Sequence, residues 1–456
     1  MTDFDHTFDH ATARLQALLE ETGVPGAALS VLQGERARTA TFGSTSVENP
    51  LPVTEQTLFQ LGSISKVYTG TAVMRLVDQG RIVLDAPVRT YLPDFRTSDV
   101  EASARVTVRH LLTHQVGWPG DIFGWPEEAY SSLAAFVERM PEAPQIIEPG
   151  RIWSYANSGI AVAGRIVEVV TGRPFHAALR ALLLDPLDLE QTAVDPGRIM
   201  TYRFAAGHLL GEEGARIVRP WPLPGCADAE GGVAASIADL LAFARFHLGS
   251  GATPDGTRLL RIETLMAMQK PQALVWEPEA WMGLTWHVSE LPETRVLFHS
   301  GRTPGTWALL LLVPEQDFAC ALLTNADRGL AIIDALRPEL VQSFLGLDLP
   351  GRPDPLPTTE AALAPYVGRY DHPYFHLEVA WQEGRPVVLF GSQVDVLPPQ
   401  MQPMTCAVAG PDRLVVLEGY LEGCTLDVFR DDEGEIEWLR DGDVLYRRQT
   451  GTSNAG

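Results

Sequence analysis

The residue pattern of the sequence changes near residue 346, and this change most constrains how the chain can fold. Up to that point, helical patterns lie between two pairs of strand-like stretches. A proline-rich segment follows over residues 346–365, which predicts a linker. Beyond it, short alternating stretches are separated by turn residues, a pattern typical of a small antiparallel β-barrel. We therefore expect three parts: residues 1–345, the linker over 346–365, and a barrel over 366–450.

The first part begins and ends in predicted β-hairpins. One joins residues 26–33 to 37–42, and the other joins 307–313 to 318–324 through a Pro-Glu-Gln-Asp turn. Helical periodicity fills the region between them, over residues 63–80, 105–114, 129–140, 157–171, 174–184, 236–248 and 260–269. Strands at both ends imply one sheet that joins early and late segments. The expected fold class is therefore α+β, an antiparallel sheet flanked by helices with an inserted helical region.

Charge and hydropathy limit the partners of the chain. The net charge of −23 argues against nucleic acid or an anionic membrane as a partner. The first residues contain neither a basic nor an apolar segment of a secretory signal, and the apolar runs are too short to span a bilayer. We expect a cytoplasmic protein with a small-molecule substrate. Whether it forms a homo-oligomer is left open.

The rarity of lysine draws attention to one pair of residues. Lys66 is one of two lysines in the chain, and it follows Ser63 by three residues. Residues three apart share one face of a helix, and the pattern after Lys66 is helical. Lysine can accept a proton, which arginine cannot. The spacing predicts a nucleophile, Ser63, beside its base, Lys66, although a chance pairing is the alternative. The other lysine, Lys270, has Ala267 at the matching position and offers no competing pair.

Two further motifs suit the same chemistry. Tyr155-x-Asn157 precedes an apolar helix, where a phenol can exchange a proton with Ser63 and with a leaving group. The alternative is a helix cap with a core tyrosine. Gly301, in the His299-x-Gly301 motif, lies before a predicted strand and lets the backbone approach a ligand. The amide that follows it can donate to an oxyanion. The alternative there is a loop with a surface histidine.

As an ordered set, these motifs resemble the serine β-lactamase-like superfamily, in the branch of class C β-lactamases, family VIII esterases and D-aminopeptidases. The resemblance covers roughly residues 10–345. The last segment resembles the lipocalin-like barrel that some D-aminopeptidases append. The matching motifs, in order, are Ser63-x-x-Lys66, Leu-Leu-Thr-His114, Tyr155-x-Asn157 and His299-x-Gly301.

The resemblance implies a role for each residue. Ser63 is the nucleophile, and Lys66 and Tyr155 share its proton, with either one as the general base. Asn157 hydrogen-bonds the substrate amide or Lys66, and the amides of Ser63 and Arg302 form an oxyanion hole. Water then releases the acyl-enzyme, and neither a metal nor an organic cofactor is needed.

Of the predictions made from the sequence, the substrate class is the least determined. His299 stands where true β-lactamases have a lysine, which argues against strong β-lactam hydrolysis. Aromatic residues including Trp118 and Trp153 flank the motifs and favour an apolar acyl group, unless they are core residues. We expect a hydrolase of carboxylic esters with small to medium acyl chains. The alternatives are a D-stereospecific aminopeptidase or amidase, in which Arg302 or the barrel holds a substrate terminus, an acyltransferase, and a non-enzymatic β-lactam receptor.

Overall fold

The computed structural model describes residues 4–276, 280–394 and 402–449. The chain divides into two compact units. The first, here called the sheet unit, consists of Met1–His114, Pro126–Pro141 and Gly159–Leu349. The second, the barrel unit, consists of Gln115–Trp125, Glu142–Ser158 and Pro350–Gly456. Two segments that precede the predicted linker in sequence thus belong with the barrel.

The sheet unit is built on one antiparallel sheet that joins the start and the end of its sequence. Strand β1 pairs with β2, and β12 pairs with β13, so both predicted hairpins are confirmed. Strand β1 also pairs with β13, which joins the two hairpins in one sheet. The strand order is β2-β1-β13-β12-β11-β10-β9-β8. The bounds are β1 (Gly26–Gln33), β2 (Arg36–Gly43), β8 (Ala273–Trp276), β9 (Ala280–Met282), β10 (His287–Leu291), β11 (Thr294–Thr303), β12 (Thr306–Val313) and β13 (Phe318–Thr324).

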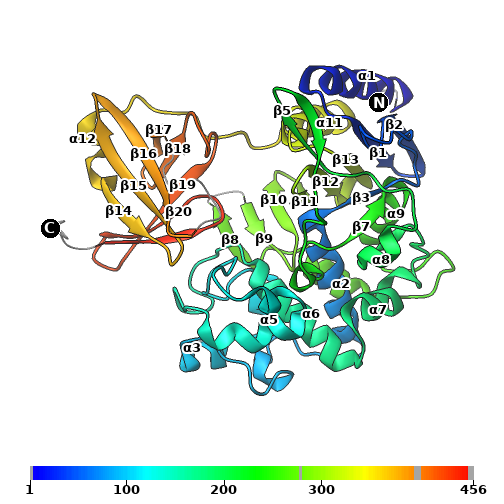
Figure 1. Ribbon diagram of the computed structural model, residues 1–456, viewed down its shortest axis with the longest axis horizontal. Helices are drawn as coiled ribbons and strands as arrows, with labels where there is room; N and C mark the ends of the chain where they lie inside the picture. The colour runs from blue at the N-terminus through cyan, green and yellow to red at the C-terminus, as the bar shows by residue number, and fades with distance from the viewer. Residues whose placement is uncertain (1–3, 277–279, 395–401, 450–456) are drawn as a thin grey trace. The chain divides into compact units, whose positions relative to one another are not determined.

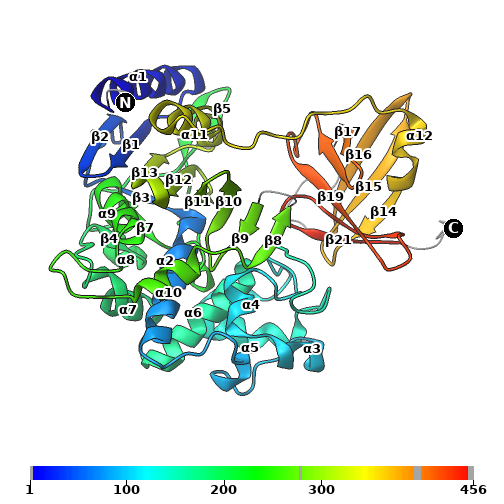
Figure 2. The ribbon, with the colours of Figure 1, turned by 180° about the vertical axis from the view of Figure 1, so that it is seen from behind.

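Helices cover both faces of this sheet. Helices α1 (Phe4–Thr22) and α11 (Gly329–Leu345) lie side by side (Figures 1 and 2). Their apolar side chains share one hydrophobic cluster with alternate residues of the central strands, such as Leu309 and Leu311. Helix α9 (Ile237–Leu248) contacts β1, β12 and β13. Neither α1 nor α11 was predicted from the sequence.

The region between the hairpins is mainly helical, as predicted, but most of its helices are shorter than their periodic patterns, and only α6 has the predicted bounds. Capping residues explain some of the starts: Thr107 caps α4 and Ser132 caps α5. A small sheet of order β3-β7-β4 and a hairpin of β5 and β6 complete the region. The helices are α2 (Ser65–Asp78), α3 (Val100–Arg105), α4 (Val108–Leu112), α5 (Leu133–Arg139), α6 (Asn157–Thr171), α7 (Phe175–Leu179), α8 (Pro196–Ile199) and α10 (Ile262–Met268). The strands are β3 (Leu58–Gln60), β4 (Thr192–Ala193), β5 (His208–Gly211), β6 (Gly214–Ile217) and β7 (Ala234–Ser236).

The barrel unit contains a closed antiparallel barrel, which confirms the predicted architecture. It closes where β14 pairs with β21, and its interior is filled by side chains such as Leu377, Leu426 and Tyr446. A short helix, α12 (Glu360–Leu363), lies within the segment predicted as a linker. Residue 450, where the predicted barrel ends, is outside the described residues. The strands are β14 (Gly368–Asp371), β15 (Phe375–Gln382), β16 (Arg385–Ser392), β17 (Met404–Gly410), β18 (Arg413–Val416), β19 (Thr425–Arg430), β20 (Ile436–Arg440) and β21 (Leu445–Arg448).

Within the described ranges, no helix is both long enough and apolar enough to cross a bilayer.

Candidate active site

Ser63 lies at the entry to helix α2. It is the middle residue of a single 3-10 turn, η1 (Gly62–Ile64), and α2 begins directly afterwards at Ser65. Gly62 has a φ of +52°, which a residue with a side chain rarely adopts. Ser63 itself is half-buried. The backbone therefore holds the serine in a defined direction and leaves it partly accessible.

Lys66 is fully buried beside this serine. Its Nζ lies 2.9 Å from Ser63 Oγ, as expected for residues three apart at the start of a helix. The same Nζ donates to the backbone carbonyl of Glu230 at 2.9 Å and lies 3.4 Å from the Glu230 carboxylate. The structure thus brings the predicted nucleophile and base together, and it adds an acidic residue that the sequence analysis did not single out.

Glu230 reaches Lys66 because the segment before strand β7 is hydrogen-bonded to α2. Thr69 Oγ1 donates to the carbonyl of Ala229 at 2.6 Å, and the Val233 amide donates to Ser65 Oγ at 2.9 Å. Strand β3, which leads to Ser63, pairs with β7. These contacts place Glu230 opposite the first turn of α2.

Strand β11 passes close to the Ser63 turn. A Cβ on Gly301 would lie 1.8 Å from the carbonyl oxygen of Leu61 and 2.9 Å from the amide of Ser63. A Cβ on Gly62 would lie 2.5 Å from the amide of Arg302. The predicted oxyanion donors, the amides of Ser63 and Arg302, therefore belong to two backbone segments in close contact. The Arg302 side chain is exposed and lies over the Trp307 ring.

His299 is buried, so the alternative of a surface histidine is wrong. Its Nδ1 donates to the carbonyl of Ser300 at 2.6 Å, and its ring lies 5.1 Å from that of His287. Burial, with further contributions from His287 and Lys66, holds the pKa of His299 well below its usual value. Near neutral pH the imidazole is therefore uncharged. It does not supply the positive charge that a lysine would bring to this position.

The segment that carries Tyr155 is fastened to the barrel. The backbone amide of Tyr155 and the hydroxyl of Ser154 both donate to the carbonyl of Asp443, at 2.9 and 3.1 Å. Arg440 donates to the carbonyl of Trp153 at 3.0 Å. Three consecutive residues, Trp153 to Tyr155, are thus held by one edge of the barrel. The part of Tyr155 in proton transfer stays a prediction.

Asn157, Trp118 and Trp153 have structural contacts within the barrel unit. Asn157 is the first residue of α6, and its Nδ2 donates to Asp121 at 2.9 Å. Trp118 is buried and donates to Ser158 Oγ at 2.9 Å. Trp153 is also buried, with the Arg440 guanidinium 5.1 Å from its ring centroid. Burial favours packing roles for both tryptophans, and contact of the three residues with substrate stays a prediction.

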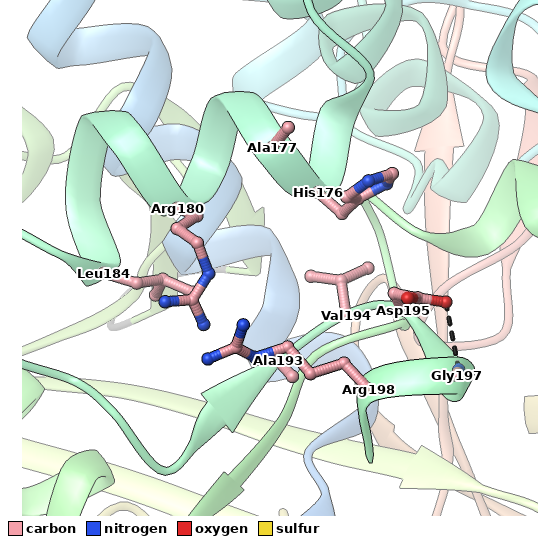
Figure 3. A pocket seen from close by; sticks show the side chains of 9 residues that line it. All are labelled: His176, Ala177, Arg180, Leu184, Ala193, Val194, Asp195, Gly197 and Arg198. Carbon is pink, nitrogen blue, oxygen red and sulfur yellow. Dashed lines mark hydrogen bonds between the residues drawn. The ribbon is translucent and has the colours of Figure 1, made fainter. Parts of the chain in front are cut away.

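A separate cavity of about 380 Å³ lies between α7 and α8 (Figure 3). None of its lining residues is a serine, threonine, cysteine or lysine, and none was predicted as a site residue. We therefore assign it no part in acyl transfer. Among the described residues, no three His, Cys, Asp or Glu side chains are grouped as ligands for a metal ion. The lining residues are His176, Ala177, Arg180, Leu184, Ala193, Val194, Asp195, Gly197 and Arg198.

Comparison with known proteins agrees with this geometry. The profile of the Beta-lactamase family matches residues 11–341. Penicillin-binding protein 4 of Amycolatopsis lactamdurans is 34% identical over 382 residues, which are 81% of this chain and 98% of the relative. Esterase EstB of Burkholderia gladioli is also 34% identical, but over 188 residues, 38% of this chain and 48% of the esterase.

Two solved structures of SurE, the second with D-Leu, match nearly the whole chain. They cover 98% of this chain and 100% of their own, with TM-scores of 0.82 and 0.79 and sequence identities of 26% and 25%. The chain belongs to the Beta-lactamase family, and the resemblance inferred from its motifs is confirmed. The family and these relatives indicate an enzyme of the serine hydrolase type.

Proposed function

We propose that this enzyme forms an acyl-enzyme at Ser63 and acts on esters or amides whose acyl group ends in a D-amino acid. The observation that carries the proposal is the 2.9 Å contact between Lys66 Nζ and Ser63 Oγ. A lysine can accept the serine proton, whereas an arginine at the same place cannot. The rest of the site supplies backbone amides at the position where negative charge develops.

The reaction follows from these groups. The proton of Ser63 passes to the neutral amine of Lys66 while Oγ bonds to the substrate carbonyl carbon. The carbonyl oxygen takes the electron pair and accepts hydrogen bonds from the amides of Ser63 and Arg302. Collapse of this intermediate expels an alcohol or amine, which receives a proton from Lys66 or Tyr155. Water then attacks the acyl group, releases the acid and restores Ser63.

One solved neighbour supports a D-residue in the substrate. SurE, which was solved with D-Leu, matches this chain over both compact units. The uncharged ring of His299 gives no fixed cation for the carboxylate of a β-lactam. This favours weak β-lactam hydrolysis at most.

Simple carboxylic esters are the second candidate class, supported by the identity with esterase EstB. The sequence favoured this class because aromatic side chains were expected to form a rim around an apolar acyl pocket. Trp118 and Trp153 are both buried, which weakens that argument. We therefore rank D-aminoacyl substrates above simple esters.

The test is a matched substrate panel measured with the wild type and Ser63→Ala. The panel contains D- and L-leucyl p-nitroanilides, p-nitrophenyl acetate to octanoate, and a chromogenic cephalosporin. We expect kcat/KM for the D-anilide to exceed that for the L-anilide by at least about tenfold. Ser63→Ala should lower every rate by more than about 10³-fold. The exposed Ser250 supplies the control variant, Ser250→Ala, which should behave like the wild type.

Each other outcome has a definite meaning. Cleavage confined to the simple esters would move the assignment to the second candidate. Equal rates for Ser63→Ala and the wild type would contradict an acyl-enzyme at Ser63. Mass spectrometry of a quenched reaction provides a direct check, because the acyl group should add its mass to the peptide that contains Ser63.

A further inference from the structure

We infer that Glu230 is a positioning residue for the reaction: it orients the amine of Lys66 toward Ser63 and stabilises the ammonium that forms there. This inference rests on the proposed function. Glu230 is not adjacent to either residue in the sequence and lies 164 residues after Lys66. Only the folded structure brings it to the site.

The contacts of Lys66 show how the orientation arises. Two oxygens of Glu230, its backbone carbonyl and its carboxylate, lie within 2.9 and 3.4 Å of Nζ. A neutral amine has two N–H groups and one lone pair. If Glu230 accepts both N–H groups, the lone pair is left for the Ser63 hydroxyl, 2.9 Å from Nζ. One residue thus directs the proton-accepting side of the amine to the nucleophile.

Glu230 is itself held in place. The hydrogen bonds on either side of it, from Thr69 to Ala229 and from Val233 to Ser65, tie its segment to α2. The Glu230 side chain is 19% exposed, so its carboxylate is largely shielded from water. Shielding strengthens the effect of its charge on a neighbouring ammonium. A carboxylate fixed in this way requires little rearrangement when Lys66 becomes charged.

The other titratable groups near Lys66 do not supply this negative charge. Burial lowers the pKa of His287 to about 4, and burial holds the pKa of His299 well below its usual value. Both rings are therefore neutral near pH 7. Glu230 is the group with a carboxylate beside Nζ.

The proton transfer is balanced without any further reactant. The Ser63 O–H bond breaks, its proton forms a third N–H bond on Lys66, and Oγ bonds to the acyl carbon. Lys66 is then an ammonium beside the Glu230 carboxylate, and the substrate oxygen carries the negative charge. When the intermediate collapses, the proton passes from Lys66, directly or through Tyr155, to the leaving group. Glu230 neither gives up nor takes up a proton in this sequence of steps, which distinguishes its role from that of an acid or base.

The test compares Glu230→Gln and Glu230→Asp with the wild type in pre-steady-state bursts of p-nitrophenol from the best ester found. Gln keeps an acceptor oxygen and removes the charge. We expect the acylation rate of Glu230→Gln to fall roughly 10- to 100-fold, with partial recovery in Glu230→Asp. The acid limb of the pH–rate profile should move to lower pH in Glu230→Gln, because the Lys66 ammonium loses a neighbouring anion.

Glu168→Gln is the matched control. The Glu168 side chain is 17% exposed, and its carboxylate pairs with Arg165 at 2.9 Å. The Glu168→Gln variant therefore loses a comparable ion pair on another helix. This control should lose stability without a change in acylation rate or pH profile. Thermal unfolding of all variants separates loss of folded enzyme from loss of rate. If Glu230→Gln does not fold, Glu230→Asp carries the comparison through its own rate and pH profile.

Two outcomes would overturn the inference, and they are distinguishable. A wild-type acylation rate and an unchanged acid limb in Glu230→Gln, with Ser63→Ala inactive, would remove Glu230 from the mechanism and leave the proposed function intact. Full activity of Ser63→Ala would overturn the proposed function and the role of Glu230 with it.

Discussion

Lys66 in the sheet unit and Arg440 in the barrel unit are both buried basic side chains, but their surroundings differ. Lys66 contacts a serine hydroxyl and the two oxygens of Glu230. Arg440, 1% exposed, donates to the Asp427 carboxylate at 2.9 Å and to the Trp153 carbonyl at 3.0 Å. Its guanidinium also lies 5.1 Å from the ring centroids of Trp153 and Phe429.

The difference shows how the chemistry of the cation suits its task. A guanidinium is planar, keeps its proton and donates in several fixed directions, which suits a permanent connection between the barrel and the 142–158 segment. An ammonium has one small centre and can release a proton, which suits catalysis. Exchanging the two residue types at each position tests whether this distinction holds.

The largest effect is expected at position 66. Lys66→Arg keeps a basic side chain but removes proton acceptance, so kcat should fall by at least about 10³-fold. The exposed Lys270 supplies the control, and Lys270→Arg should leave kcat unchanged. Steady-state rates of both variants provide the measurement. Near-native turnover by Lys66→Arg would contradict the distinction between the two residue types, because an arginine would then suffice for catalysis as well as for the structural contact.

The reciprocal exchange at position 440 should mainly affect stability. Arg440→Lys keeps the ion pair with Asp427, but it loses the second hydrogen bond and the stacking on two rings. We expect a loss of about 2 kcal/mol in the free energy of unfolding. Arg369, which makes a more exposed pair with Asp371, is the control, and Arg369→Lys should cost less than about 1 kcal/mol. Denaturant unfolding checks both values, and equal costs would refute a clamping role for Arg440.

A smaller, pH-dependent effect is expected at Asp441 in the barrel. Burial raises the pKa of this carboxyl to about 7, although Tyr446 and the Val444 amide donate hydrogen bonds to it. The folded state therefore binds this proton more tightly than the unfolded state, whose pKa is near 3.8. The free energy of unfolding should consequently fall as the pH rises from about 4 to about 7.

Asp441→Asn isolates this contribution because asparagine does not titrate. The stability of the wild type relative to Asp441→Asn should decline across that pH range, as measured by denaturant unfolding at several pH values. The exposed Asp432→Asn is the control and should track the wild type closely. A constant difference between the wild type and Asp441→Asn would contradict the prediction. Turnover per folded molecule should not change in either variant, which sharpens the contrast with Lys66.

Local patterns predicted much of the fold. Alternating apolar residues bounded by turns located both hairpins and most barrel strands, because strand formation there depends on nearby residues. Helix α1 was missed although Phe4, Phe8, Ala11, Leu15 and Leu18 form its buried face. Polar and charged residues between them obscure that pattern. The small residues of strand β17, such as Ala407 and Ala409, give little alternation, so its sequence does not mark it clearly as a strand.

Some contacts of the candidate site could likewise be predicted from local patterns, and others could not. The spacing of Ser63 and Lys66 along one helix was sufficient to predict their contact. Neither Glu230 nor Asp443 has a local signal of its contact with a predicted motif. The sequence also did not decide whether Trp118 and Trp153 are buried. An aromatic residue near a motif is equally consistent with the rim of a substrate pocket and with the hydrophobic core.

By itself, the sequence determined the family, the α+β class with a terminal barrel, and the serine–lysine pair. Those features depend on periodicity and on motifs a few residues long. The tertiary structure decided which distant segments meet within each unit: Glu230 beside Lys66, β11 against the Ser63 turn, and the barrel edge that holds the Tyr155 segment. These contacts join segments far apart in the chain, and they exist only because particular strands pair and particular faces are buried together.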